Sequence, residues 1–304
     1  MRGFVLGKIA ADLDQALARR EASGAPGRTT GRLVAGGNGW SVEDLLCTCG
    51  PGDRPFEERH TAMSIGVVVR GTFQYRSPLG RDLMTPGSFL LGNAGQCFEC
   101  GHEHAAGDRC VALRYAPDYF DRLAADAGAP SGERRFRASR LPPVRALSGL
   151  VARAAAGVVG SIDVSWEELA VQVAATAIRL AGDLQRDRLQ APPGSLTRVT
   201  RSVRTIERHP GAHLTLHQLA ADAGLSPFHY LRTFQRLTGV TPHQFILHAR
   251  LRQAAARLVR EKARVIDIGL EAGFGDISNF NRSFRAEFGV APEVYRQQMG
   301  RREE

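Results

Sequence analysis

The sequence predicts an α+β fold in which a region of antiparallel strands precedes a long helical region. Up to about Leu113, short apolar runs such as MSIGVVVRG are separated by glycine and proline, which is the pattern of strands and tight turns. From Pro142 to Leu189 the sequence is rich in alanine and leucine at helical spacing. Beyond residue 195 short helices are expected as far as Arg302, and part of this region is repeated.

Length and composition are those of a globular protein with more than one domain. The chain has 304 residues, of which 43% are hydrophobic and 23% are charged. No apolar run approaches the roughly 18 residues of a membrane span, so no membrane partner is expected. The N-terminus reaches Asp12 and Asp14 too early for a secretory signal, which predicts a cytoplasmic location.

The changes of pattern predict three segments: residues 1–140, 141–195 and 196–304. APPGS, at 191–195, breaks the helical pattern and is expected to be a linker. Residues 196–304 hold 17 Lys and Arg against 10 Asp and Glu, whereas the first 195 residues hold 23 against 21. A basic surplus in one segment is typical of a nucleic-acid-binding surface. The alternative is an arginine-rich proteome, because Lys8 and Lys262 are the only lysines.

The last third contains an internal repeat. YLRTFQRLTGVTPHQF, Tyr230–Phe245, aligns with FNRSFRAEFGVAPEVY, Phe280–Tyr295, at an offset of 50 residues. Upstream, LAADAGLS aligns with IGLEAGFG, so each copy is expected to form a helix, a glycine turn and a second helix. QFILHARLRQAAARLV, between the copies, predicts one long amphipathic helix. One copy would be a weak indication of helix-turn-helix units, but two joined copies are a strong one.

The second helix of each copy is expected to leave polar side chains on its open face. Ser226 and Asp276 are natural N-caps for these helices. Arginine can pair in bidentate fashion with guanine and asparagine with adenine, so Asn279 and Arg282 have the chemistry of base readers. The alternative for each such residue is an ordinary solvated polar face.

From about Val199 to Met299 the chain resembles the AraC/XylS family of bacterial transcription regulators. The residues that carry the resemblance are VIDIGLEAGFGDISNFNRSFRAEFGVAPEVYR, Val265–Arg296, and LAADAGLSPFHYLRTFQRLTGVTP in the first copy. The match covers about a third of the chain and departs from the family at Ala291, where a hydroxyl residue is usual. The resemblance implies two helix-turn-helix units whose recognition helices enter successive major grooves on one face of double-stranded DNA.

The resemblance also implies which residues contact DNA. Leu231 occupies a position that is polar in many members, so its contact would be apolar or absent. Arg250 is expected to contact phosphate. The residues implied to face bases are Phe228, Leu231, Arg232, Ile277, Ser278, Asn279 and Arg282, and those implied to contact phosphates are Arg236 and Arg285.

GRDLMTPGSFLLGNAGQCFECGHEH resembles, more weakly, the cupin-like sensory domain that precedes the DNA-binding half in many of these regulators. It implies a small antiparallel β-barrel that binds an effector, followed by helices that often dimerise. Residues 144–189 would supply those helices and a homodimer contact. Further partners implied by the resemblance are an unidentified effector and, if the protein activates transcription, RNA polymerase.

Cysteine and histidine residues gather in the first half of the chain. An odd number of cysteines without a signal peptide argues against a disulfide framework. CFECGHEH, at 97–104, is expected on a strand, where Cys100, His102 and His104 would share one face. A site for zinc or another soft metal is one hypothesis, with Cys47, Cys49, Cys100 and His102 as ligands and Cys97, His104 and Cys110 as further candidates. The alternatives are core cysteines beside a solvated turn, or a thiol sensor of oxidants or electrophiles.

An effector-responsive transcriptional regulator is the leading hypothesis. No paired general acid and base stands out, so catalysis is not expected and no cofactor is certain. Two alternatives from other classes stay open: a metal-dependent cupin enzyme, or a cysteine-based DNA-repair protein, each fused to an AraC-like DNA-binding module. The sequence does not identify the effector, the operator or the direction of regulation.

Overall fold

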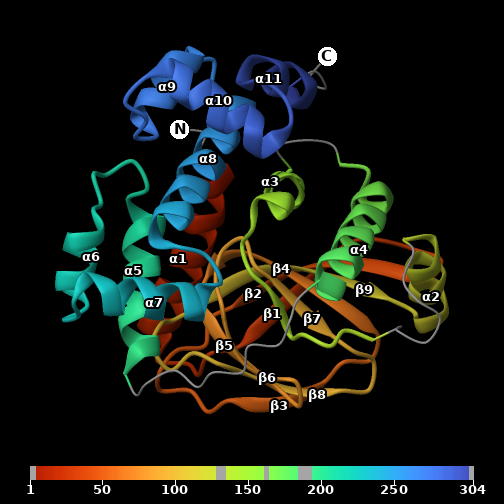
Figure 1. Cartoon of the computed structure of the whole chain (residues 1–304). Helices are drawn as coiled ribbons and strands as arrows, with labels where there is room; N and C mark the ends of the chain where they lie inside the picture. The colour runs from red at the N-terminus through yellow and green to blue at the C-terminus, as the bar shows by residue number, and fades with distance from the viewer. Residues whose placement is uncertain (1–4, 128–134, 161–163, 184–193, 301–304) are drawn as a thin grey trace.

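The first half of the protein forms two antiparallel sheets. The computed structural model describes residues 5–127, 135–160, 164–183 and 194–300 (Figure 1). One sheet has the strand order β1-β2-β9-β4-β7-β10 and the other has β3-β8-β5-β6. The strands are β1 (Thr29–Gly37), β2 (Trp40–Cys47), β3 (Phe56–Arg59), β4 (Met63–Gly71), β5 (Phe73–Ser77), β6 (Gly80–Met84), β7 (Phe89–Gly92), β8 (Cys97–Gly101), β9 (Asp108–Tyr115) and β10 (Arg140–Leu141).

Helices precede, cover and follow these sheets. They are α1 (Val5–Ser23), α2 (Pro117–Asp126), α3 (Arg145–Val158), α4 (Trp166–Asp183), α5 (Ser195–Arg208), α6 (Leu216–Asp222), α7 (Pro227–Thr238), α8 (Pro242–Arg260), α9 (Val265–Glu271), α10 (Ile277–Phe288) and α11 (Pro292–Gly300). A strand region followed by an all-helical region confirms the α+β class. The middle helical region consists of α3 and α4, separated at residues 159–165.

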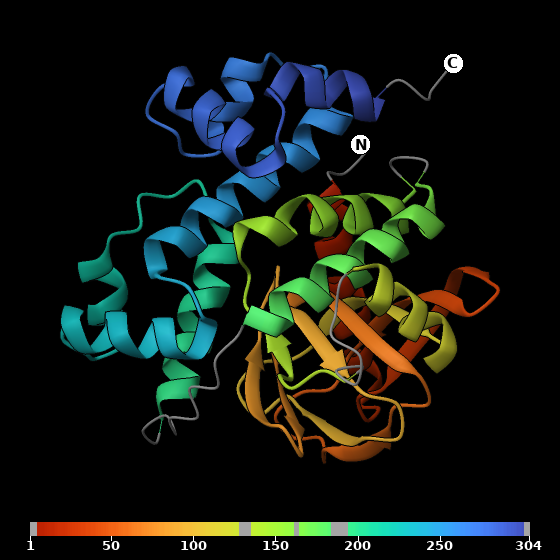
Figure 2. The ribbon, with the colours of Figure 1, turned by 45° about the vertical axis from the view of Figure 1, so that its right-hand side comes forward.

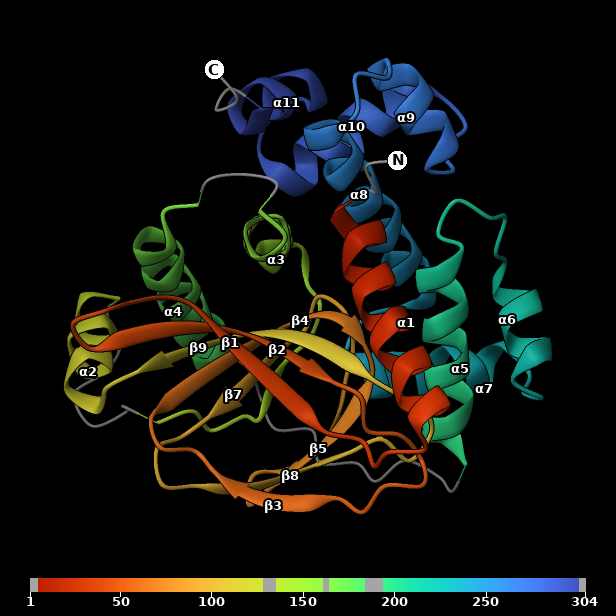
Figure 3. The same ribbon diagram turned by 180° about the vertical axis from the view of Figure 1, so that it is seen from behind.

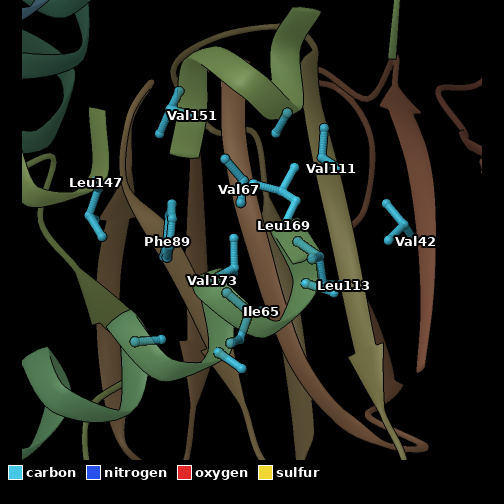
Figure 4. Close-up of a cluster of buried hydrophobic side chains, with 14 of the residues drawn as sticks. Val42, Ile65, Val67, Phe89, Val111, Leu113, Leu147, Val151, Leu169 and Val173 are labelled. Carbon is cyan, nitrogen blue, oxygen red and sulfur yellow. The ribbon is translucent and has the colours of Figure 1, made fainter. Parts of the chain in front are cut away.

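Alternation along the strands explains why the larger sheet is buried on both faces. On β4, Val67 and Val69 belong to the core that β4 shares with α3 and α4, whereas Val68 belongs to the core shared with the smaller sheet. Figure 4 shows Leu147 and Val151 of α3 and Leu169 and Val173 of α4 over this sheet. Between the two sheets, aromatic and sulfur-containing side chains fill the interior: Phe73, Tyr75, Met84 and Cys110, with Phe98 and Cys100 at its edge.

Helix α8 joins two separate hydrophobic cores. Phe245 and Ala249, in its first half, pack into the core formed with α5, α6 and α7. Leu251 and Leu258, in its second half, pack into the core formed with α9, α10 and α11. The two helical groups therefore lie at opposite ends of one continuous helix (Figures 1 and 2).

Helix α8 is more deeply buried than the expected amphipathic helix. Helices α1 and α3, which precede the repeated region of the sequence, pack against it (Figure 3). Even Arg252 is only 6% exposed, because Glu207 of α5 forms an ion pair with it at 2.6 Å. Sequence periodicity of the helix alone could not reveal these distant neighbours.

Two further expectations concern the linker at 191–195 and membrane-spanning helices. Of the expected linker at 191–195, residues 191–193 lie outside the described part of the chain. Ser195 begins α5 and is buried, so the helical region resumes there. None of the helices that the structure describes is long and apolar enough to span a membrane.

Candidate DNA-binding surface and buried thiol site

The first recognition helix, α7, starts at a side-chain cap. The Ser226 hydroxyl accepts a hydrogen bond from the backbone N–H of His229, and Pro227 occupies the first helical position. Tyr230 and Phe234 are fully buried, so the opposite face of α7 is turned toward solvent. On that face the Phe228 side chain is 62% exposed, and the Arg232 guanidinium lies 5.6 Å from the centre of its ring.

The second recognition helix, α10, has the same construction. The Asp276 carboxylate accepts a hydrogen bond of 2.7 Å from the backbone N–H of Asn279. Phe280 and Phe284 are fully buried, fifty positions after Tyr230 and Phe234. The residues of this helix that are exposed and carry polar side chains include Ser278, Asn279, Arg282 and Arg285.

The predicted DNA contacts differ in how far they reach into solvent. Arg236, like Arg232 in α7, is exposed. Leu231 and Ile277 are half-buried, and Ile277 packs against the core around α10. A half-buried apolar side chain at the edge of a recognition helix can still meet a thymine methyl group.

The sequence predicted that Arg250 of α8 contacts phosphate. In the structure its guanidinium is bonded within the protein instead of extending into solvent. Its guanidinium donates to the carbonyl oxygens of Pro210 (2.8 Å), Ala212 (3.0 Å) and Gly273 (2.8 Å). The first two precede α6 and the third lies in the α9–α10 turn. Arg250 therefore ties the two helix-turn-helix units together, a role that depends on contacts between segments far apart in the sequence.

The backbone of the two units also meets directly beside Arg250. A Cβ added to Gly211 would lie 2.6 Å from the carbonyl oxygen of Glu271, and one added to Gly273 would lie 2.8 Å from that of Gly211. Gly273 has φ +92°, a conformation that side chains disfavour. Glycine is thus required at position 273 for two reasons: the turn needs a positive φ, and the backbone of the first unit lies too close for a side chain.

Residues that precede the helix-turn-helix units contact each recognition helix near its C-terminal end. The Arg140 guanidinium donates to the carbonyl of Leu237 in α7 at 2.8 Å and to that of Leu83 at 3.2 Å. At α10, the Glu287 carboxylate accepts a hydrogen bond from the Ser148 hydroxyl of α3 and lies 2.6 Å from Nδ1 of His248 in α8. Both contacts leave the N-terminal ends of α7 and α10 uncovered.

A buried cluster of Cys47, His102 and Asp108 lies at one end of the barrel. One potential ligand atom from each residue lies within 4.8 Å of the other two. Cys47 and Asp108 are cross-strand partners of β2 and β9, and Nε2 of His102 lies 2.7 Å from Oδ1 of Asp108. Cys47 and His102 were among the expected ligands, whereas Asp108 was not. An acidic residue two positions before Cys110 was the available sequence signal.

The cluster is electrostatically coupled. Burial alone would lower the pKa of His102, but its hydrogen bonds to Asp108 and Cys47 outweigh burial and raise that pKa to about 10. Burial raises the pKa of the Cys47 thiol, against the opposing effect of its hydrogen bond with His102. The hydrogen bonds of His102 therefore favour its protonated ring, and burial favours the neutral thiol of Cys47.

The other cysteine and histidine candidates occupy different places. The Cys49 thiol is hydrogen-bonded to Cys47, and the Cys110 thiol donates to Oδ2 of Asp108 at 3.2 Å. Cys100 packs between the two sheets, and Cys97 is half-buried on β8.

The expectation that Cys100, His102 and His104 share a strand face is wrong because β8 ends at Gly101. Nδ1 of His104 instead lies 3.2 Å from the Thr197 hydroxyl of α5. His102 and His104 therefore belong to the loop between β8 and β9.

Comparison with known proteins agrees with this architecture. A family model described as a helix-turn-helix domain matches residues 219–298. The transcriptional activator NphR of Rhodococcus sp. is 30% identical over 282 residues, which cover 82% of this chain and 81% of the relative. The chain belongs to the AraC/XylS family of transcriptional regulators. This AraC-family regulator is also 34% identical to the MmsAB operon regulatory protein of Pseudomonas aeruginosa over 94 residues, 31% of each chain.

Solved structures resemble this regulator in part or over most of its length. The DNA-binding domain of AdpA, in complex with a target DNA, is 26% identical, with a TM-score of 0.34, covering 35% of this chain and 96% of that one. ToxT from Vibrio cholerae O395 is 12% identical, with a TM-score of 0.35, covering 86% and 98%. The family assignment rests on the sequence match to NphR and on the helix-turn-helix model.

Proposed function

We propose that this AraC-family regulator recognises its operator with α7 and α10 acting as a pair. The observation that carries the proposal is the shared support of the two helices. Each begins at a side-chain cap and exposes equivalent positions, and both are packed on the single helix α8 and tied by Arg250. Helix α8 has 19 residues, or about 28 Å at 1.5 Å per residue, a suitable spacer for two grooves about one turn apart.

We assign base contacts and phosphate contacts to different residues of these helices. The exposure of Phe228, Arg232, Ser278, Asn279 and Arg282 supports their assignment to bases, and Leu231 and Ile277 complete that set at the edges of the two helices. Arg236 and Arg285 are assigned to phosphates. In the described part of the chain neither forms an ion pair with a carboxylate, which leaves their charges available to DNA.

We assign residues 1–140 to effector sensing, 141–195 to linkage and dimerisation, and 196–304 to DNA binding. The contacts of Arg140 with α7 and of Ser148 with α10 support a path by which a conformational change in the first two segments reaches both recognition helices. Helix α4 buries one face on the larger sheet, and its other face is the candidate surface for a second copy. The name of NphR, an activator, supports contact with RNA polymerase.

Binding-site selection from random duplex DNA, with the full chain, tests the proposal. The expected product is a consensus with two preferred segments about one helical turn apart. Affinity for that consensus should fall steeply with salt because phosphate contacts release counterions. Failure to select any consensus, or an affinity that does not respond to salt, would contradict the proposal.

A further inference from the structure

We propose that Cys47, His102 and Asp108 form a binding site for Zn²⁺, and that the bound metal is the signal to which the DNA-binding region responds. The first part concerns the barrel alone. The second part rests on the proposed function, because a metal can act as an effector only if the protein binds an operator.

The three side chains converge from separate segments and are held close to metal-binding geometry. Cys47 ends β2, His102 follows β8 and Asp108 begins β9. Their ligand atoms lie within 4.8 Å of one another. Bonds of about 2.0–2.3 Å to a tetrahedral zinc place ligand atoms roughly 3–4 Å apart, so small side-chain rotations suffice to close the site.

The donor set fits a borderline-soft cation. A thiolate, an imidazole nitrogen and a carboxylate oxygen are the three ligand types that zinc takes in proteins. The side chains are nearly inaccessible, with Cys47 at 7%, His102 at 6% and Asp108 at 6% exposure. Zinc takes the thiolate of Cys47 and a neutral imidazole of His102, so any protons on these ligand atoms would pass to solvent, and the metal would replace the hydrogen bond between His102 and Asp108.

Neighbouring groups can complete and support the site. The thiols of Cys49 and Cys110 adjoin Cys47 and Asp108, so either thiol, or a water molecule, can supply a fourth ligand. The turn that follows Cys49 is fixed by the Asp53 carboxylate, which accepts a hydrogen bond of 2.7 Å from the Gly50 N–H and pairs with Arg20 at 2.7 Å. Such support outside the ligands holds them in position.

The packing of the strand region favours an ion over an organic effector. A site for a drug-sized organic molecule occupies about 300 Å³ or more. The space between the sheets is filled by Phe73, Tyr75 and Met84, whereas a metal at the thiol cluster requires no such cavity.

The loop that carries His102 also contacts the DNA-binding region. Two residues later, the ring of His104 lies 3.2 Å from the Thr197 hydroxyl of α5. Helix α5 packs through Val199 and Val203 against Tyr230 and Phe234 of α7. A shift of His102 toward a metal would therefore be transmitted through one short loop and one helix to the first recognition helix.

Metal content of the purified full chain tests the site. After chelator treatment and dialysis against Zn²⁺, the wild type should retain about one zinc ion per chain. Cys47→Ser and Asp108→Asn should each weaken zinc binding by about 10-fold or more. The matched control is Cys97→Ser, because Cys97 lies on β8 away from the cluster and its loss should leave binding unchanged.

Substitution with Co²⁺ separates loss of a ligand from loss of the fold. The wild type should show a thiolate-to-cobalt charge-transfer band that Cys47→Ser removes, or weakens if a second thiolate is bound, while far-ultraviolet circular dichroism stays unchanged. Cys49→Ser and Cys110→Ser then identify the fourth ligand. The proposed site is overturned if zinc is not retained, or if folded Cys47→Ser and Asp108→Asn bind it as tightly as the wild type.

Operator affinity, measured with and without Zn²⁺, tests the effector role. We expect a change in Kd of about 5-fold or more in the wild type and none in Cys47→Ser. Equal affinity in both conditions would overturn the effector role even if zinc is bound. Absence of any operator binding would overturn the proposed function as well, while the metal measurements would still decide whether the site exists.

Discussion

The two helix-turn-helix units share a backbone plan but present different chemistry to solvent. At the start of α7 the exposed side chain is the aromatic Phe228, with Arg232 over its ring. The matching stretch of α10 presents the small polar side chains of Ser278 and Asn279, followed by Arg282. The repeat therefore preserves a scaffold while its exposed side chains differ, and we expect each copy to read a different kind of base-pair surface.

The units also differ in how their following helices begin. Thr241 and Gln244 form a reciprocal capping box at the start of α8, after the first unit. At the equivalent position before α11, Ala291 has no hydroxyl to cap the helix. The first unit is therefore followed by a helix with a reciprocal side-chain cap, whereas the residue before α11 cannot provide such a cap.

The largest effect on both units is expected from Arg250→Ala. Three carbonyl oxygens would lose their donor at the contact between the units, at a cost of about 2–4 kcal/mol in the free energy of unfolding. Thermal and denaturant unfolding measure this loss, and operator binding should weaken at both segments together. Arg250→Lys keeps the charge, but its donors all sit on one nitrogen and cannot replace the three guanidinium nitrogens that each bond a different carbonyl, so it should behave like Arg250→Ala. A variant as stable as the wild type would show that the units are not tied at this point.

The next largest effect is expected from Arg282→Ala, and it should be confined to one unit. Loss of a bidentate base contact should cost roughly 1–3 kcal/mol in operator binding and relax the preference at particular base pairs. Binding-site selection on the full chain measures this change. If Arg282→Ala and the wild type select identical sites, Arg282 does not read bases.

Phe228→Ala tests the apolar readout expected of the first unit. Removing an apolar contact with a thymine methyl group should cost about 1 kcal/mol and reduce a preference for thymine at one position. Because Phe228 is 62% exposed, stability should change by no more than about 0.5 kcal/mol. Phe228→Leu is the control that keeps apolar contact. A preference that survives Phe228→Ala would assign the readout to another residue.

The smallest effect is expected from Arg285→Ala. Loss of one phosphate contact should weaken binding to all sequences alike and reduce the salt dependence of log Kd by a slope of about 1. Titration of one operator and one unrelated duplex at several salt concentrations measures both quantities. An effect restricted to the operator would move Arg285 into the base-reading set.

Local patterns in the sequence were enough to predict the helix-turn-helix units. Glycine turns, capping residues and buried aromatic positions recur within each copy, and each depends on neighbours a few residues away. The antiparallel strands were predictable for the same reason, from alternation and turns.

Contacts between distant segments were not predictable. Arg250 looked like a free cation because its three carbonyl partners lie 23 to 40 residues away. Asp108 lies beside Cys47 because of the pairing register of β2 with β9. His104 lies against α5 because β8 ends at Gly101 and the chain turns there. Strand ends and pairing registers are decided by the whole fold rather than by local preference.

The central claim is that α7 and α10 read DNA as a rigid pair, and base-resolved footprinting of the full chain on its selected operator tests it most directly. The wild type should protect two segments about one helical turn, roughly 34 Å, apart on one face of the duplex. Arg232→Ala should relax base preference only in one segment and Arg282→Ala only in the other. Protection of a single segment, or both substitutions acting on the same base pairs, would contradict the paired-reading account.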